Sequence, residues 1–158
     1  VFFDTLLDKL NAGEVEAVLA HELGHFHHRH IVKRLALLAP ASLGLLALLG
    51  WLAAQPWFFT GLGVTAQDTA TALALFVLVL PAFAFALGPL FSHWSRRHEF
   101  QADAYAARHA RAADLVAALV KLYRDNASTL TPDPLHSVFY DSHPPASLRI
   151  AHLKGLAT

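Results

Sequence analysis

Residues 21–25 of this 158-residue chain read His-Glu-Leu-Gly-His, the pattern H-E-x-x-H, within a segment of helical periodicity. Residues four apart share one face of an α-helix, so the imidazoles of His21 and His25 can reach the same metal ion. Glu22 follows beside the open coordination position, where it can accept a proton from an attacking water molecule. The pattern therefore predicts a zinc-dependent hydrolase with two histidine ligands and a glutamate base. The alternative is an ordinary polar helix face in a chain with 11 histidines.

A catalytic zinc ion usually has three protein ligands and one open position, so a third ligand must come from elsewhere. The extended motif with a third histidine soon after the first two fails, because Ile31 stands at that position. Glu99 and Asp103 form a carboxylate pair with the same four-residue spacing. We expect Glu99 to be the third zinc ligand and Asp103 to accept the second ring N–H of a ligand histidine. The alternative is a surface acid pair beside Arg96 and Arg97.

The elements that must position these residues are expected to be helices, two of which are long enough to cross a membrane. Residues 14–34 are predicted to form the helix that carries H-E-x-x-H. Residues 35–54 and 69–91 contain no charged side chain, and each run has about the 20 residues that span a bilayer core. Further helices are expected at 93–110 and within 112–158, where a His-Pro-Pro loop precedes the last helix. The predicted fold class is all-α, an integral membrane helical bundle with one peptidase domain over residues 1–158.

Charges beside the apolar runs predict an orientation. Three basic residues lie between positions 29 and 34, before the first run, and Arg96 and Arg97 follow the second run. The loop between the runs has no Lys or Arg, so the positive-inside rule places both basic ends on the cytoplasmic side. Two spans would then return Glu99 to the side of the H-E-x-x-H helix. The basic ends and the neutral loop favour the membrane over a pair of helices buried in a soluble core.

Composition limits the remaining classes of function. Apolar residues make up 55% of the chain, above the usual ~45–50% of soluble domains. Lys+Arg and Asp+Glu are equal at 12 each, so bulk charge suggests neither nucleic acid nor an acidic partner. The absence of Cys excludes disulfides and thiolate-held zinc. Because the chain begins at Val1 and contains no Met, we expect it to be a fragment of a longer protein.

Several segments, taken in order, resemble the CAAX prenyl protease 1 family. The most specific are H-E-L-G-H at 21–25, S-R-R-H-E-F-Q-A-D-A-Y-A at 95–106 and S-H-P-P at 142–145. F-D-T-L at 3–6 and D-P-L at 133–135 are similar to the same family. HtpX-type proteases share the H-E-x-x-H and E-x-x-x-D elements and fit the F-D-T-L and S-H-P segments less well.

The resemblance implies a gluzincin-type zinc endopeptidase whose membrane helices surround an enclosed chamber. Members of the family cut near the C-terminus of isoprenylated proteins that end in a CAAX box. The resemblance implies one zinc ion per chain, with the three ligands and the base named above. It also implies that His143 and Arg149 contact the substrate or stabilise the tetrahedral intermediate. Without the family, His143 is better explained as a turn residue held before two prolines.

The other histidines are expected to be structural or solvated: His27, His28, His30, His93, His98, His109, His136 and His152.

Two further functions stay open. A quality-control protease of the HtpX type would cut misfolded membrane proteins and need no prenyl group. The Ala/Leu-rich composition without Met or Cys suggests a bacterial inner membrane, where prenylated CAAX substrates are scarce. A non-catalytic metal-binding membrane scaffold is the second alternative, and the intact Glu22 argues against it. The expected partners are the lipid bilayer and a polypeptide substrate, with a prenylated C-terminal CAAX peptide as the candidate.

Overall fold

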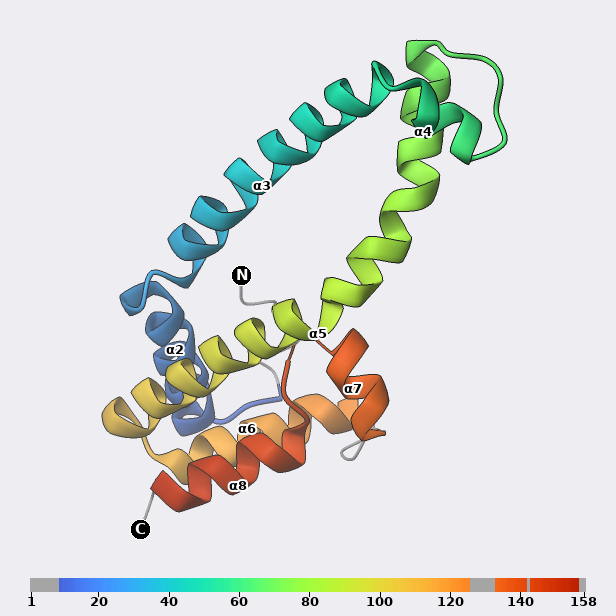
Figure 1. Ribbon diagram of the computed structural model, residues 1–158. Coiled ribbons are helices and arrows are strands. Elements are labelled where there is room, and N and C mark those ends of the chain that lie inside the picture. The colour runs from blue at the N-terminus through green and yellow to red at the C-terminus, as the bar shows by residue number, and fades with distance from the viewer. Residues whose placement is uncertain (1–8, 126–132, 142, 157–158) are drawn as a thin grey trace. The chain divides into compact units, whose positions relative to one another are not determined.

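The computed structural model describes residues 9–125, 133–141 and 143–156, and the regular elements in these ranges are all helices, as predicted. The F-D-T-L segment at 3–6 and Ser142, both part of the family resemblance, lie outside the described residues. Figure 1 labels the helices, which are α2 (Ala12–His27), α3 (His30–Ala53), α4 (Pro56–Gly61), α5 (Thr69–His109), α6 (Ala112–Asp125), α7 (Pro134–Tyr140) and α8 (Ala146–Leu156).

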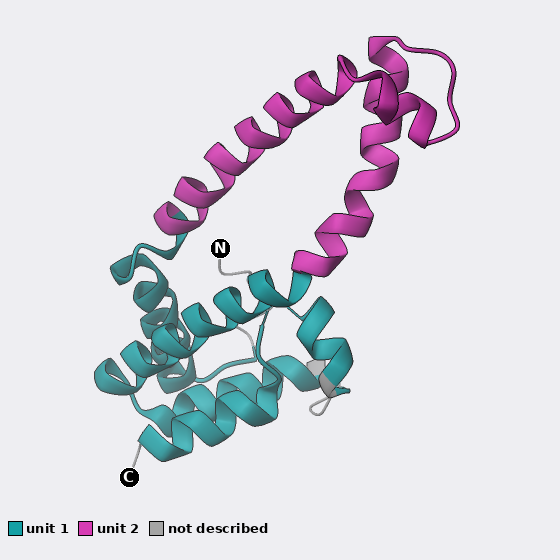
Figure 2. Cartoon of the chain, in the orientation of Figure 1, with its two compact units in different colours: residues 1–31, 88–158 teal, residues 32–87 magenta. Residues whose placement is uncertain are grey.

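The chain divides into two compact units (Figure 2). Unit 1 comprises residues 1–31 and 88–158, and unit 2 comprises residues 32–87. Every residue that the sequence assigned to the site belongs to unit 1.

The core of unit 1 consists of small and branched apolar side chains from α2, α5, α6 and α8. The buried members are Ala17, Ala20, Ala106, Leu115, Leu119 and Leu153. Helix α6 packs against both α2 and α8, because its leucines recur at four-residue spacing on one face. Alanines on α2 and α5 leave little bulk between these helices, which lets their backbones approach closely.

A capping box begins α2. The Asn11 side chain accepts a hydrogen bond from the Glu14 backbone N–H at 2.9 Å, and a Glu14 carboxylate oxygen accepts from the Asn11 N–H at 2.8 Å. This reciprocal pair satisfies two of the backbone donors that a helix start leaves unpaired. Glu14 is buried and also forms an ion pair with Lys121 of α6 at 2.7 Å. The start of α2 is therefore fixed to α6.

The end of α2 differs from the prediction of one helix over 14–34. Arg29 has a φ of 54°, in the left-handed region that non-glycine residues rarely adopt. The Arg29 N–H bonds to the carbonyl of Phe26 at 3.0 Å, so the chain turns there and α3 begins at His30. An arginine gives no sequence signal for such a turn.

Helix α5 also differs from the prediction, which had separate helices at 69–91 and 93–110. It runs unbroken for 41 residues, with Pro81 and Pro89 inside it. Each proline removes one backbone hydrogen bond, a loss that membrane-spanning helices tolerate better than soluble ones.

Unit 2 contains most of α3, the short α4 and the first part of α5. Helices α3 and α5 are long and apolar enough to cross a membrane, and their most apolar stretches are almost entirely exposed. The predicted runs 35–54 and 69–91 lie within these two helices apart from one residue after α3. In helix α4, Pro56 occupies the first turn, and Phe58 and Phe59 bury against Ala72.

Helix α7 lies within residues 112–158, where the sequence predicted helices without giving bounds for this one. The Asp133 side chain caps it by accepting hydrogen bonds from the N–H groups of Leu135 at 2.8 Å and His136 at 3.0 Å. The helix predicted after the His-Pro-Pro loop is present as α8.

Candidate active site

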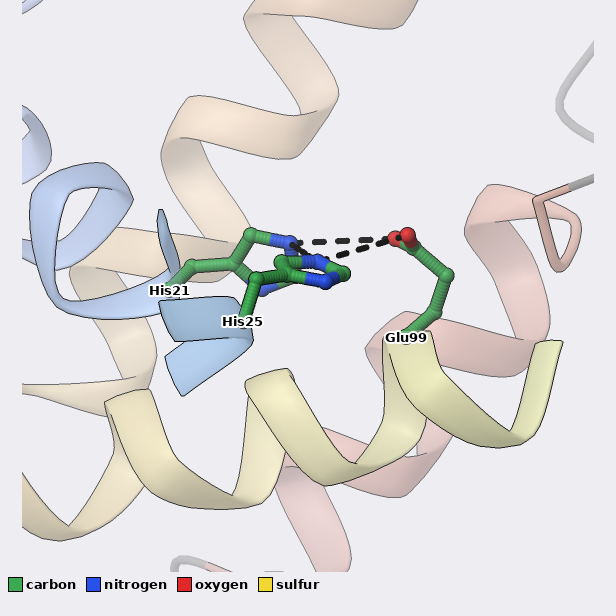
Figure 3. A group of neighbouring side chains, drawn as sticks. All are labelled: His21, His25 and Glu99. Atoms are coloured by element: carbon green, nitrogen blue, oxygen red, sulfur yellow. Dashed lines mark hydrogen bonds and ion pairs between the residues drawn. The ribbon is translucent and has the colours of Figure 1, made fainter. Parts of the chain in front are cut away.

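Helices α2 and α5 bring the three expected metal ligands together. The Nε2 atoms of His21 and His25 lie 3.2 Å apart. Glu99 places one carboxylate oxygen 3.7 Å from His21 Nε2 and the other 3.4 Å from His25 Nε2. Figure 3 shows the two imidazoles and the carboxylate pointing toward one another. Within the described ranges, these three residues form the group whose geometry could hold a metal ion.

The spacing of this group fits a tetrahedral zinc site. Zinc binds imidazole nitrogen and carboxylate oxygen at about 2.0–2.2 Å, so tetrahedral ligand atoms lie about 3.3–3.6 Å apart. The observed separations of 3.2, 3.4 and 3.7 Å are close to this range. Two histidines and one carboxylate are also the donor set of catalytic zinc sites, which leave a fourth position open. The residues present therefore fit the metal that the motif implies.

The burial of the expected metal ligands affects their protonation. His21 is 7% exposed and Glu99 is 5% exposed. Burial lowers the pKa of His25, although the nearby Glu99 carboxylate opposes this shift. Metal ions bind the neutral imidazole, so the lowered pKa favours the form that a metal ligand requires.

Asp103 orients His21. One Asp103 carboxylate oxygen lies 3.0 Å from His21 Nδ1, and Asp103 is fully buried one turn after Glu99 on α5. When His21 donates its Nδ1–H to this carboxylate, the lone pair of His21 Nε2 faces His25 and Glu99. His21, His25 and Glu99 are called the ligand group below.

Arg149 of α8 holds both carboxylates of α5. Its Nε donates to one Asp103 oxygen at 2.8 Å, its Nη2 donates to the other, and its Nη1 lies 3.2 Å from Glu99. Burial opposes the charge of Arg149, but the hydrogen bonds and charge of Asp103, followed by the charge of Glu99, raise the pKa of Arg149. Each guanidinium nitrogen thus contacts a carboxylate, which makes Arg149 a support for the ligand group.

His143 lies at the edge of the ligand group. Its side chain is 63% exposed, and its Nδ1 is 3.2 Å from a Glu99 oxygen. The next residue, Pro144, is fully buried, and its carbonyl accepts a hydrogen bond from the Tyr123 hydroxyl at 3.3 Å. The buried proline anchors the loop while the imidazole stays exposed to solvent.

Glu22, the expected general base, is exposed on α2 directly after His21. Gly24, the second variable position of H-E-x-x-H, is buried where α2 meets α5.

The position of His30 next to His25 was not predicted from the sequence. His30 was expected to be structural or solvated, yet its Nδ1 lies 2.9 Å from Nδ1 of the ligand His25. Its Nε2 lies 3.0 Å from the side-chain oxygen of Gln101, and the residue is 5% exposed. Spacing could not show this contact, because five residues do not bring two side chains to one helix face.

Comparisons with known proteins agree with the geometry. A family model described as peptidase family M48 matches residues 1–157. The chain is 35% identical to a CAAX prenyl protease 1 homolog of Arabidopsis thaliana, over 98% of the chain and 37% of that protein. It is 36% identical to the Homo sapiens homolog, over 89% of the chain and 30% of that protein. The chain thus spans about a third of the length of these relatives.

A solved structure is also similar. The crystal structure of Ste24p from S. mikatae matches with a TM-score of 0.82 and 31% sequence identity. The match covers 97% of this chain and 38% of that one.

Proposed function

The chain belongs to peptidase family M48, and from this membership we propose that it carries the active site of a zinc-dependent membrane endopeptidase. The resemblance to CAAX prenyl proteases that the sequence motifs indicated is confirmed. The observation that carries the proposal is the ligand group itself, since the separations of His21, His25 and Glu99 fit one tetrahedral zinc ion.

The proposed site is of the gluzincin type, with two histidines of H-E-x-x-H and a later glutamate as ligands. When bound, zinc supplies Lewis acidity, which polarises a carbonyl and makes water a nucleophile near neutral pH. Asp103 orients His21, and Arg149 holds Asp103 and Glu99 in place.

Two exposed side chains are proposed to contact the reacting groups. Glu22 takes a proton from the attacking water and returns it to the leaving amine. His143 donates a hydrogen bond to the developing oxyanion, an interaction worth about 2.7–4 kcal/mol of barrier in other hydrolases. Both side chains are accessible in the structure, as contact with a peptide requires.

We propose a polypeptide substrate and, more narrowly, a prenylated C-terminal CAAX peptide. The names of the relatives favour this substrate over the HtpX-type quality-control role and over a non-catalytic scaffold. The basic residues beside the apolar helices support an active site on the cytoplasmic side. A bacterial inner membrane is suggested by composition alone, and the relatives reported above are eukaryotic.

Mass-spectrometric mapping of cleavage tests the function, using the protein as its gene encodes it, purified in detergent. The substrates are a farnesylated CAAX peptide, its unprenylated twin and an unfolded membrane-protein segment. Cutting of the farnesylated peptide alone would support a prenyl-protein protease, and equal cutting of all three would move the function to general membrane proteolysis.

Two variants test the chemistry in the same preparation. Glu22→Gln should abolish turnover while zinc stays bound, and residual activity near wild type would contradict the assigned base. Glu99→Ala should weaken zinc retention, and unchanged zinc occupancy would mean that another residue is the third ligand. A wild-type protein that binds no zinc would overturn the proposed function.

A further inference from the structure

His30 is held in one orientation by the face of α5 next to the ligand group. Its ring stacks on His98, with centroids 4.0 Å apart and an interplanar angle of 10°. His98 is itself buried and meets Trp94 edge-on at 4.6 Å. A ring packed in this way has little freedom to turn, so the hydrogen bonds of its two nitrogen atoms are fixed in direction.

These hydrogen bonds have one consistent arrangement of protons when the rings are neutral. The side-chain oxygen of Gln101 can only accept, so His30 Nε2 carries its proton and His30 Nδ1 keeps a lone pair. That lone pair accepts a hydrogen bond from Nδ1–H of His25. His25 Nε2, the atom that faces His21 and Glu99, is then left without a proton.

If the oxygen and nitrogen of the Gln101 amide were exchanged, the direction of each hydrogen bond from Gln101 through His30 to His25 would be reversed. An amide N–H would donate to His30 Nε2, His30 Nδ1 would donate to His25, and His25 Nε2 would carry a proton. A protonated Nε2 cannot bind a metal ion. The orientation in the structure is therefore the one that suits a metal ligand.

The backbone is strained at the joint that brings His30 to His25. In a continuous helix, residues five apart lie about 140° apart around the axis, too far for their rings to meet. The left-handed Arg29 between α2 and α3 breaks that periodicity. Such a conformation is unfavourable for a residue that carries a Cβ atom. Strain of this kind concentrates at functional sites, where the surrounding structure maintains it.

We propose that His30 and Gln101 are positioning residues for His25. The two side chains keep the proton of His25 on Nδ1 and direct its Nε2 at the metal. Each ligand histidine then has its own orienting partner, since Asp103 serves His21 in the same way. The inference rests on the proposed zinc site and adds a requirement to it.

Zinc affinity tests the proposal, measured by chelator competition on the encoded protein in detergent. His30→Leu removes the acceptor at similar volume, and we expect zinc to bind about 10- to 100-fold more weakly. His30→Asn places an oxygen near the position of Nδ1 and should recover most of that loss. Gln101→Met removes the accepting amide and should weaken zinc binding in the same direction. His27→Leu is the matched control, since His27 is an exposed histidine at the end of α2, and it should keep wild-type affinity.

A second measurement separates positioning from folding. The d–d absorption spectrum of the cobalt-substituted protein reports ligand geometry, and it should change in His30→Leu and return toward wild type in His30→Asn. The melting temperature of the metal-free protein shows whether each variant folds. If His30→Leu does not fold, the zinc affinity of Gln101→Met tests the proposal in its place.

Wild-type zinc affinity in both His30→Leu and Gln101→Met would overturn the inference while leaving the proposed zinc site intact. It would also be overturned if a folded His30→Asn bound zinc no better than His30→Leu. Absence of zinc binding in the wild-type protein would instead refute the proposed function.

Discussion

Gly24 of α2 packs directly against the backbone of Ala102 in α5. A methyl group at position 24 would lie 3.0 Å from the Ala102 Cα and 3.1 Å from its carbonyl oxygen. Both are backbone atoms, which cannot turn aside as a flexible side chain could. Gly24, between His21 and His25, therefore allows α2 to come close enough for Glu99 to join these histidines in the proposed metal site.

Gly24→Ala should weaken zinc binding although alanine favours helices by about 1 kcal/mol over glycine. Overpacking typically costs about 1–3 kcal/mol. We expect the added methyl group to push α2 away from α5, which would move His21 and His25 away from Glu99 and lower zinc affinity roughly tenfold. Chelator competition measures the affinity, and circular dichroism should show unchanged helix content. Gly155→Ala is the control, because a methyl group at that position of α8 would meet no atom within 4 Å. Equal affinity in the two variants would contradict the proposed role of the contact.

Arg149→Met should strongly destabilise the metal-free protein. It would leave Asp103 fully buried without its two guanidinium hydrogen bonds, and breaking a buried pair usually costs about 3–5 kcal/mol. Chemical unfolding followed by circular dichroism measures the loss. The double variant Arg149→Met with Asp103→Asn should be less destabilised than Arg149→Met alone, because position 103 then carries no unpaired buried charge. Additive losses would show that the two side chains do not support each other.

The ion pair at the start of α2 predicts a dependence of stability on pH. The hydrogen bond from Lys121, followed by the one from the Asn11 backbone, lowers the pKa of Glu14 below its ordinary value of 4.5. A carboxylate with a lowered pKa in the folded state stabilises the fold above its unfolded pKa. That contribution is lost as the pH falls through the lower, folded-state pKa.

Glu14→Gln should therefore be less stable than wild type at neutral pH, and the difference should shrink as the pH falls below 4.5. Urea unfolding between pH 3 and 7 measures this difference. Glu16→Gln, at an exposed position on the same helix, should follow the wild-type curve. A difference between Glu14→Gln and wild type that stays constant with pH would contradict the predicted linkage.

The left-handed turn at Arg29 predicts that glycine is tolerated at this position and that a β-branched residue is not. Arg29→Gly should keep zinc affinity within about twofold of wild type, since glycine adopts positive φ without steric cost. Arg29→Val should lower both the melting temperature and zinc affinity, because a β-branched residue at positive φ is strained. Similar behaviour of the two variants would show that the backbone conformation at this joint does not matter for the site.

The part of the site that sequence could predict lies within single helices. His21 and His25, like Glu99 and Asp103, are four residues apart, and that spacing alone places each pair on one face. The order of the motifs along the chain then allowed a search for the third ligand. Neither step needs knowledge of how the helices pack.

The rest depends on tertiary structure. Arg149 and Asp103 belong to different helices, so no periodicity relates the guanidinium to the carboxylate that it binds. His30 reaches His25 only through a left-handed arginine, a residue type that does not signal a turn. The length of α5 was underestimated because the prediction ended the helix at residue 91, where the uncharged run ends, whereas the helix continues to His109.

The position of the ligands along the chain has a consequence for biosynthesis. His21 and His25 precede α3, whereas Glu99 follows the apolar part of α5. A ribosome therefore makes two ligands before both candidate membrane helices and the third ligand after them. Until Glu99 has been synthesised, a nascent chain lacks the third proposed ligand. Zinc binding by all three proposed ligands therefore requires that both apolar helices have already been synthesised.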